Sequence, residues 1–337
     1  MMDLRRNHAF RQLRLASDLH RVSRRSFLIG AAFGLGTAAD LAATRAIQEM
    51  RNEAQILTLD DERADRRFPH SSWVLFPGYK TSWEEGLWIL NSLRGGLVDR
   101  GRLAVAGYSN RGLDLAELTE VLQKHIQDND LQRLYFYGHS FGGMVAVEMT
   151  ARLRAKGFPV ELILMDSSPY SRFDVLDKTM FEGVVFLYEA GYRVPSYLRG
   201  GYELGERIVH KDERTWRQIV EQTMEQLSPL AVSSTLIQSQ SSYIYHFDAY
   251  RFRHSIGDTR IAWMGNPGDQ TVNYSTARRS WQVNYEANFL TNNLVTEGAR
   301  PAHASPQWNS AIYVPIVQQV ADEFFPLPVV GGRKTYY

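Results

Sequence analysis

One short turn constrains the fold of this chain more than any other feature of its sequence. The segment GHSFG, residues 138–142, follows an apolar run at Arg133–Tyr137 and precedes a stretch of helical character that reaches about Lys156. Glycines two residues before and two after a serine allow a strand and a helix to turn sharply, because no side chain separates the backbones. Ser140 is then exposed at a helix N-terminus, where backbone N–H groups favour an oxyanion. The segment therefore predicts a strand, a nucleophile turn and a helix.

The chain from Trp73 onward alternates short apolar runs with amphipathic stretches, which is typical of a parallel sheet with crossover helices. Thr81 and Glu84 have the spacing of a capping box, so we expect a helix to begin there. The expected strands cover residues 73–76, 102–106, 133–137, 160–165, 260–264 and about 293–296. The expected helices cover about 81–94, 115–126, 141–156, 275–285 and 309–325.

The alternation stops between about residues 167 and 258, where helical periods dominate. This interval predicts a helical unit inserted after the fourth expected strand. The fold class is therefore α/β, with a mostly parallel central sheet flanked by helices and an inserted helical cap.

The N-terminal residues have a different composition from the rest. Residues 1–25 hold seven arginines and two aspartates, and the thirteen residues 27–39 are uncharged and mostly apolar. Thirteen residues are short for a bilayer span, which takes about 20. The segment SRRSFL, residues 23–28, resembles the twin-arginine export signal, and Ile29 is the one departure from its pattern.

Two interpretations of this head remain open. It is an export signal, read by export machinery that delivers a folded protein to the periplasm or beyond, or it is an uncleaved segment that anchors the protein at a membrane. In both cases residues 1–46 form a signal or anchor segment, and residues 47–337 form the folded domain.

Composition excludes several classes of function. The chain has no cysteine, so disulfide scaffolds, cysteine-ligated zinc, iron–sulfur clusters and a cysteine nucleophile are excluded. A net charge of +1 is too balanced for a broad nucleic-acid surface. No zinc-protease, phosphate-loop or dinucleotide motif occurs, so we expect no metal and no cofactor.

The segment GHSFGG, residues 138–143, resembles the nucleophile elbow of the α/β-hydrolase family, and the resemblance runs from about Trp73 to Phe325. It implies Ser140 as nucleophile, then an acid, then a histidine, in that chain order. A serine needs such a base with a carboxylate behind it. His303 lies after the last expected strand and before the last expected helix, as the family's histidine does.

Two carboxylates are candidates for the acid. Asp269 follows the expected strand at residues 260–264, in a segment similar to the family's strand, turn and acid, and is the preferred candidate. Asp166 ends the preceding strand, a position that some members of the family use, and is the alternative. Either would orient His303 and stabilise its protonated form.

An oxyanion hole needs two N–H donors in addition to the triad. The resemblance implies the backbone N–H of Phe141, directly after the nucleophile, and that of Tyr79, in the loop after the first expected strand. Pro77 stands where the family often has histidine, which leaves the backbone donor in place.

These residues predict a serine hydrolase that cleaves a carboxylic ester or related acyl bond through an acyl-enzyme. Ser140 excludes the family members that use an aspartate nucleophile. The expected partner is a small-molecule or lipid-like acyl substrate. The alternatives are an acyltransferase or cofactor-free perhydrolase with the same triad, and a catalytically silent binding protein with the same fold.

Overall fold

The computed structural model describes residues 49–176, 232–324, 329–330 and 333–334. The chain divides into two compact units, residues 1–50 and 51–337, and of the first only Glu49 and Met50 are described. The sequence-predicted head, residues 1–46, lies outside the described residues, as do residues 177–231 of the expected cap. Among the helices that the structure describes, none is long and apolar enough to cross a membrane.

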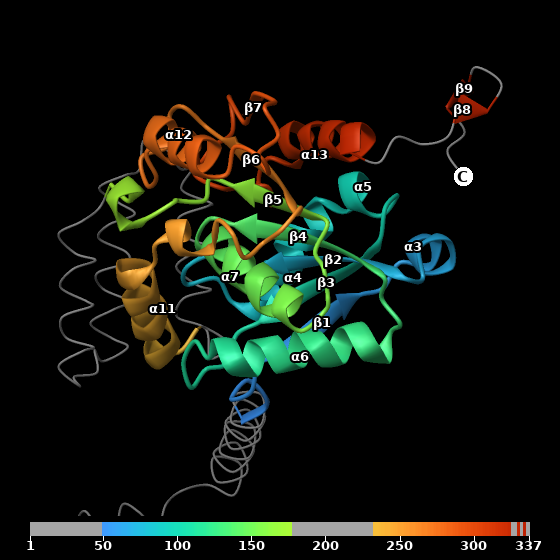
Figure 1. The fold of residues 1–337 in the computed structure, drawn as a ribbon, viewed down its shortest axis with the longest axis horizontal. Helices are drawn as coiled ribbons and strands as arrows, with labels where there is room; N and C mark the ends of the chain where they lie inside the picture. The colour runs from blue at the N-terminus through green and yellow to red at the C-terminus, as the bar shows by residue number, and fades with distance from the viewer. Residues whose placement is uncertain (1–48, 177–231, 325–328, 331–332, 335–337) are drawn as a thin grey trace, which may run out of the picture. The chain divides into compact units, whose positions relative to one another are not determined.

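A central sheet organises the larger unit (Figure 1). Its described strands number seven, in the order β1-β3-β2-β4-β5-β6-β7. Only β1 is antiparallel to its neighbour, so the expected mostly parallel sheet is confirmed. The strands are β1 Gln55–Leu59, β2 Ser71–Phe76, β3 Arg102–Gly107, β4 Arg133–His139, β5 Leu162–Asp166, β6 Arg260–Gly265 and β7 Leu294–Val295.

Helices connect these strands, and a second, two-stranded sheet pairs β8 Val329–Val330 with β9 Arg333–Lys334. The described α-helices are α3 Glu62–Arg67, α4 Trp83–Ser92, α5 Arg94–Leu97, α6 Leu115–Asp128, α7 Phe141–Ala155, α11 Ser234–His246, α12 Tyr274–Asn284 and α13 Ser310–Phe324. Two short 3₁₀ turns are η2 Arg172–Asp174 and η4 Ala249–Phe252.

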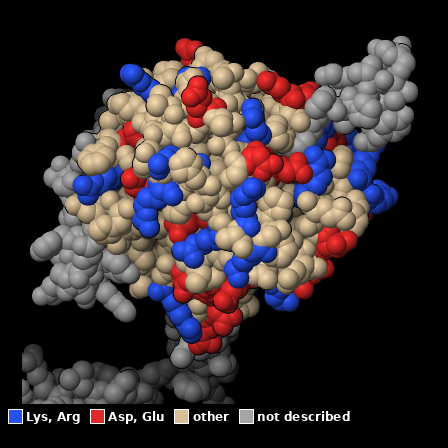
Figure 2. Space-filling view, in the orientation of Figure 1, with Lys and Arg blue, Asp and Glu red and all other residues tan. Residues whose placement is uncertain are grey.

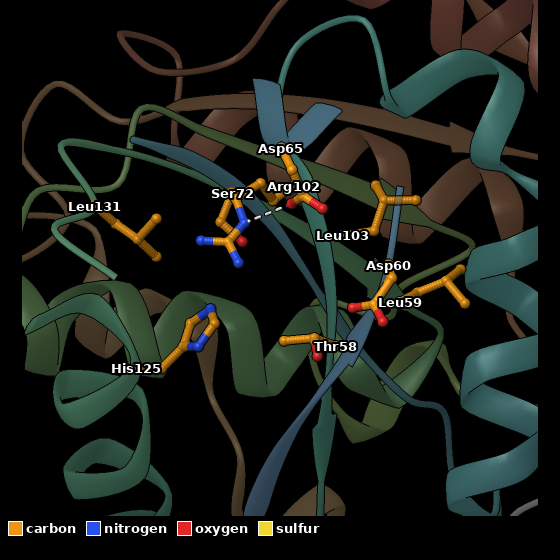
Figure 3. A pocket seen from close by; sticks show the side chains of 9 residues that line it. All are labelled: Thr58, Leu59, Asp60, Asp65, Ser72, Arg102, Leu103, His125 and Leu131. Atoms are coloured by element: carbon orange, nitrogen blue, oxygen red, sulfur yellow. Dashed lines mark hydrogen bonds and ion pairs between the residues drawn. The ribbon is translucent and has the colours of Figure 1, made fainter. Parts of the chain in front are cut away.

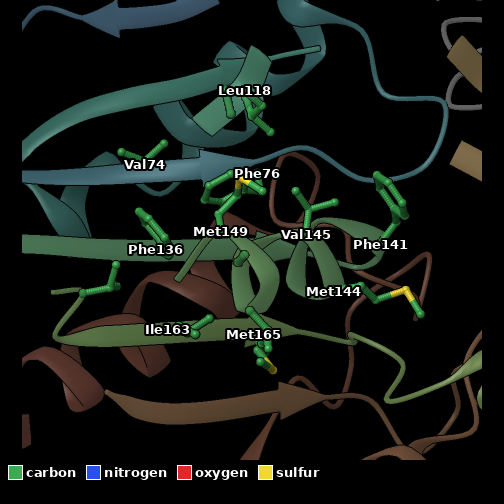
Figure 4. Close-up of a cluster of buried hydrophobic side chains, with 14 of the residues drawn as sticks. Val74, Phe76, Leu118, Phe136, Phe141, Met144, Val145, Met149, Ile163 and Met165 are labelled. Atoms are coloured by element: carbon green, nitrogen blue, oxygen red, sulfur yellow. The ribbon is translucent and has the colours of Figure 1, made fainter. Parts of the chain in front are cut away.

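The two faces of the sheet are covered by separate hydrophobic clusters, because side chains alternate along a strand. In β2, Val74 and Phe76 face the cluster that α6, α7 and α12 complete, whereas Trp73 and Leu75 face the cluster that α4, α5 and α13 complete. Figure 4 shows the first cluster, with Val145 and Met149 of α7 directed at the sheet. Every residue of β2 is buried, as expected of a central strand with helices on both faces.

Two local predictions were wrong. The N-cap of α4 is Ser82, whose side chain accepts a hydrogen bond from the N–H of Glu85 at 3.1 Å, so the cap lies one residue after the expected Thr81. Strand β1 was not expected at all. It is a half-exposed edge strand, and its leucines at 57 and 59 pack on one side of the sheet while Ile56 packs on the other.

The surface carries charges of both signs. Figure 2 shows basic and acidic side chains interspersed over the face in view. Oppositely charged side chains pair at several places on the protein, such as Arg133 with Glu161 and Arg152 with Glu148. These pairs compensate charge locally.

Candidate active site

The nucleophile turn lies between β4 and α7. Ser140 has φ 51° and ψ −117°, a left-handed backbone that non-glycine residues seldom adopt. Its N–H donates to the carbonyl oxygen of Asp166 at 2.8 Å, which ties the turn to the end of β5. The surrounding contacts hold Ser140 in this strained conformation at the N-terminus of α7, where its side chain is only partly buried.

Close backbone approaches explain the glycines of the turn. A Cβ on Gly138 would lie 2.3 Å from the Cα of Gly143, so strand and helix touch there. A Cβ on Gly142 would lie 1.9 Å from the carbonyl oxygen of Phe76 in β2. The second glycine is thus required mainly by the neighbouring strand, and this contact brings the nucleophile turn against the loop that follows β2.

His303 joins the serine to a carboxylate. Its Nε2 lies 2.7 Å from Ser140 Oγ, and its Nδ1 lies 2.7 Å from Asp269 Oδ2. Both ring nitrogens are therefore engaged by the residues that the sequence selected. An unprotonated Nε2 can accept the serine proton, while Nδ1–H donates to the carboxylate.

The loop after β6 fixes Asp269. Its Oδ1 accepts hydrogen bonds from the N–H groups of Thr271 and Val272 at 2.8 and 2.9 Å, which leaves Oδ2 for His303. Burial alone would raise the pKa of Asp269, but His303 and the hydrogen bonds that the carboxylate accepts hold it below its usual value. Asp269 is therefore ionised at neutral pH.

Asp166, the alternative acid, occupies a different place. It is fully buried at the end of β5, and its Oδ2 accepts a hydrogen bond from the hydroxyl of Tyr137 at 2.9 Å. Burial raises the pKa of Asp166 to about 7. The structure thus brings Asp269, and not Asp166, into hydrogen-bond contact with His303.

His139, a residue of the nucleophile turn for which the sequence favours a packed, hydrogen-bonded structural role, supports the His303 loop. Its Nε2–H donates to the carbonyl oxygen of Ala304 at 2.7 Å. Burial, followed by the nearby His303, lowers the pKa of His139 to about 4, so it is neutral. A Cβ on Gly78 would lie 2.6 Å from its Nδ1. His139 therefore packs between the loop after β2 and the loop that carries His303.

The two expected oxyanion donors lie on neighbouring segments. Phe141 is the first residue of α7, and Tyr79 lies in the loop after β2 that Gly142 contacts. Neither backbone N–H donates to an acceptor in the described part of the chain. Both remain available for an oxygen that develops negative charge beside Ser140.

Comparison with solved structures gives the fold. A hydrolase from Oleispira antarctica matches with a TM-score of 0.56 at 11% identity, covering 80% of this chain and 94% of the other. MenH from S. aureus matches with a TM-score of 0.57 at 9% identity, covering 81% and 98%. An esterase (EaEST) from Exiguobacterium antarcticum matches with a TM-score of 0.54 at 14% identity, covering 80% and 94%. The chain has an α/β-hydrolase fold.

Sequence comparison gives a narrower match within this fold. A thioesterase domain model matches residues 97–181, which run from the end of α5 past β5 and include Ser140 and Asp166. A search of curated proteins found no match. His303 and Asp269 lie beyond the matched residues, so their assignment depends on the geometry described above.

A pocket lies at the end of the sheet opposite to Ser140. Figure 3 shows this pocket, lined by residues that include Ser72, Arg102 and His125. Ser72 and Arg102 lie at the starts of β2 and β3, whereas Ser140 follows the end of β4. Among the described residues no group of histidines and carboxylates is arranged to hold a metal ion.

Proposed function

We propose that this protein is a serine hydrolase that cleaves a carboxylic ester or a related acyl bond through an acyl-enzyme. The observation that carries the proposal is the pair of 2.7 Å contacts that link Ser140 Oγ to His303 and His303 to Asp269. The elbow backbone of Ser140 and the two available N–H groups support the same chemistry.

Each residue has a role in this reaction. Ser140 Oγ attacks the acyl carbon and passes its proton to His303 Nε2, while Asp269 stabilises the imidazolium that forms. The N–H groups of Tyr79 and Phe141 donate to the oxyanion of the tetrahedral intermediate. His303 then protonates the leaving alcohol or thiol. Water, activated by His303, hydrolyses the acyl-enzyme in a second round of the same steps.

The thioesterase domain match makes acyl thioesters one substrate class to test, and the likeness to solved esterases makes oxygen esters the other. An ester and a thioester with the same acyl group form the same acyl-enzyme and differ only in the group that leaves. A panel of matched oxygen esters and thioesters with equal acyl chains therefore compares leaving groups while the acyl group is constant.

The proposal is tested by a fluorophosphonate probe, which forms a bond from phosphorus to an activated serine Oγ and releases fluoride. Intact mass is followed for wild type, Ser140→Ala and His303→Ala. Ser92→Ala, on α4, is the matched control because its hydroxyl donates to the carbonyl of Ile89 in the same helix, at 2.7 Å.

We expect one adduct on wild type and on Ser92→Ala, and none on the other two variants. A folded wild type that stays unlabelled, or equal labelling of Ser140→Ala, would contradict the proposal. An ester panel with added alcohol or peroxide then shows whether water or another nucleophile resolves the acyl-enzyme.

We also propose that residues 1–46 direct export through the twin-arginine pathway. The support is the SRRSFL segment at residues 23–28 and the weakly apolar stretch that follows it.

A further inference from the structure

Helix α11 has polar side chains that are buried. Ser234–His246 lies beyond the carboxyl ends of the parallel strands (Figure 1). Gln240 and Ser241 are both fully buried, although their side chains carry hydrogen-bonding groups. Buried polar groups of this kind are costly unless they are paired. Their partners therefore show what the helix docks against.

Both partners lie in the loop after β2. Ser241 Oγ donates to the carbonyl of Ile237 at 2.9 Å, so at 2.7 Å it accepts the hydrogen bond of the Tyr79 hydroxyl. The side-chain oxygen of Gln240 accepts from the backbone N–H of Lys80 at 3.2 Å. Two consecutive residues of α11 thus bind two consecutive residues of this loop.

The loop needs such support because its backbone is irregular. Lys80 has φ 61°, a left-handed conformation. The hydrogen bond from Gln240 satisfies the N–H of Lys80, while the N–H of Tyr79 has no acceptor among the described residues. Helix α11 therefore holds the backbone N–H of Lys80 and the side-chain hydroxyl of Tyr79. It leaves the backbone N–H of Tyr79, the expected oxyanion donor, available.

The same helix also contacts the segment that carries the second donor. The ring of Tyr243 packs edge-on against that of Phe141, with centroids 5.7 Å apart. The hydroxyl of Tyr243 donates to Glu148 Oε2 on α7 at 2.9 Å. One helix thus touches both residues whose N–H groups form the expected oxyanion hole.

We propose that α11 positions the oxyanion hole, with Ser241 and Gln240 acting as positioning residues for Tyr79. This inference rests on the proposed function, because an oxyanion hole matters only if Ser140 forms a tetrahedral intermediate. The hydrogen bonds of α11 set where the Tyr79 N–H points. Their loss should reduce the rate of acyl transfer more than substrate binding.

The test uses Tyr79→Phe and Ser241→Ala, alone and combined. Tyr79→Phe keeps the ring and the backbone N–H and removes only the hydroxyl that binds Ser241. Ser239→Ala is the matched control, because Ser239 Oγ accepts at 2.8 Å from the N–H of Leu113, in a different loop. All proteins are full-length, and melting temperatures are recorded for each.

We expect each single variant to lower kcat by about 10-fold to 100-fold, since a displacement of about 1 Å can cost about 10²-fold. KM should change by less than about twofold, and the rate of fluorophosphonate labelling should fall with kcat, since that reaction also places an oxygen in the hole. The double variant should lose no more than the worse single variant, because both substitutions break one hydrogen bond. Ser239→Ala should keep its kcat.

Three results would overturn the inference while the wild type is active: unchanged kcat in Tyr79→Phe and Ser241→Ala, independent losses that multiply in the double variant, or an equal loss in Ser239→Ala. A wild type that neither reacts with the probe nor hydrolyses any ester instead refutes the proposed function, and the inference fails with it.

Discussion

Replacing each of the two candidate acids, Asp269 and Asp166, by its amide separates their roles. Asp269→Asn and Asp166→Asn remove the same charge and keep nearly the same volume. Of these two carboxylates, Asp269 is hydrogen-bonded to His303 at 2.7 Å, whereas Asp166 accepts from Tyr137 at 2.9 Å. The two variants should therefore differ in activity even though both lose a carboxylate close to the same histidine.

The magnitude for Asp269→Asn follows from the hydrogen bonds around it. The N–H groups of Thr271 and Val272 require an acceptor at Oδ1, so the asparagine must turn its NH₂ group toward His303. Nδ1 of His303 then accepts, its proton moves to Nε2, and Nε2 can no longer take the proton of Ser140. A wrong tautomer of this kind costs about 10⁴-fold in kcat in a serine protease, which is about 5 kcal/mol.

Asp166→Asn should instead change stability. Burial raises the pKa of Asp166 from 3.8 to about 7, so folded protein holds this proton more tightly than unfolded protein does. The contribution of Asp166 to the free energy of unfolding of the wild type is fully present below about pH 4 and is lost as the pH rises toward 7. Asparagine cannot ionise, so the melting temperature of the variant relative to wild type should increase over that interval and stay constant above it. Its kcat should change by less than about tenfold, or about 1.4 kcal/mol.

Steady-state hydrolysis of an ester at pH 8 measures kcat, and thermal melting from pH 4 to 9 measures stability. If both amide variants lose activity equally, or if Asp269→Asn keeps most of its kcat, the assignment of the acid is wrong. If the difference in melting temperature does not depend on pH, Asp166 is not held protonated by burial.

Two further predictions concern the nucleophile turn and the N-terminal segment. Gly142→Ala should lower the melting temperature and abolish probe labelling, because its Cβ would lie 1.9 Å from the carbonyl oxygen of Phe76 and overpacking costs about 1–3 kcal/mol or more. Gly95→Ala, whose Cβ would meet nothing nearer than 3.5 Å, should melt and label as wild type does. Replacing Arg24 and Arg25 by lysine should leave the protein in the cytoplasm of a host with twin-arginine export, which cell fractionation measures. Unchanged export of this variant would show that residues 23–28 are not a twin-arginine signal.

The sequence predicted those features whose causes are local. The elbow could be predicted because Gly138, Ser140 and Gly142 are close in sequence and each has a steric reason. The central strands could be predicted because burial on both faces produces continuous apolar runs, such as β2 and β5. Strand β1 carries no such run, because an edge strand is half-exposed and keeps Gln55 and Thr58.

The placement of Asp269 and His303 required long-range contacts that the sequence does not contain. Their chain order agrees with the family pattern, but their 2.7 Å contacts depend on loops that follow different strands. The support from His139 to Ala304 spans 165 positions in the chain. The carboxyl ends of several parallel strands meet at one end of the sheet, which brings such loops together.

The docking of α11 shows why a polar pattern alone is ambiguous. By helical period Leu236, Ile237 and Ile244 mark the buried face of α11. Gln240 and Ser241 lie on this same face, one turn after Leu236 and Ile237, although glutamine and serine side chains are usually exposed. Yet Gln240 and Ser241 are buried, because Gln240 accepts from the backbone N–H of Lys80 and Ser241 binds the side-chain hydroxyl of Tyr79. A helix that supplies acceptors to such a loop must bury polar side chains. Buried polar residues on a helix that covers a sheet end therefore indicate which irregular loop the fold has to hold rigid.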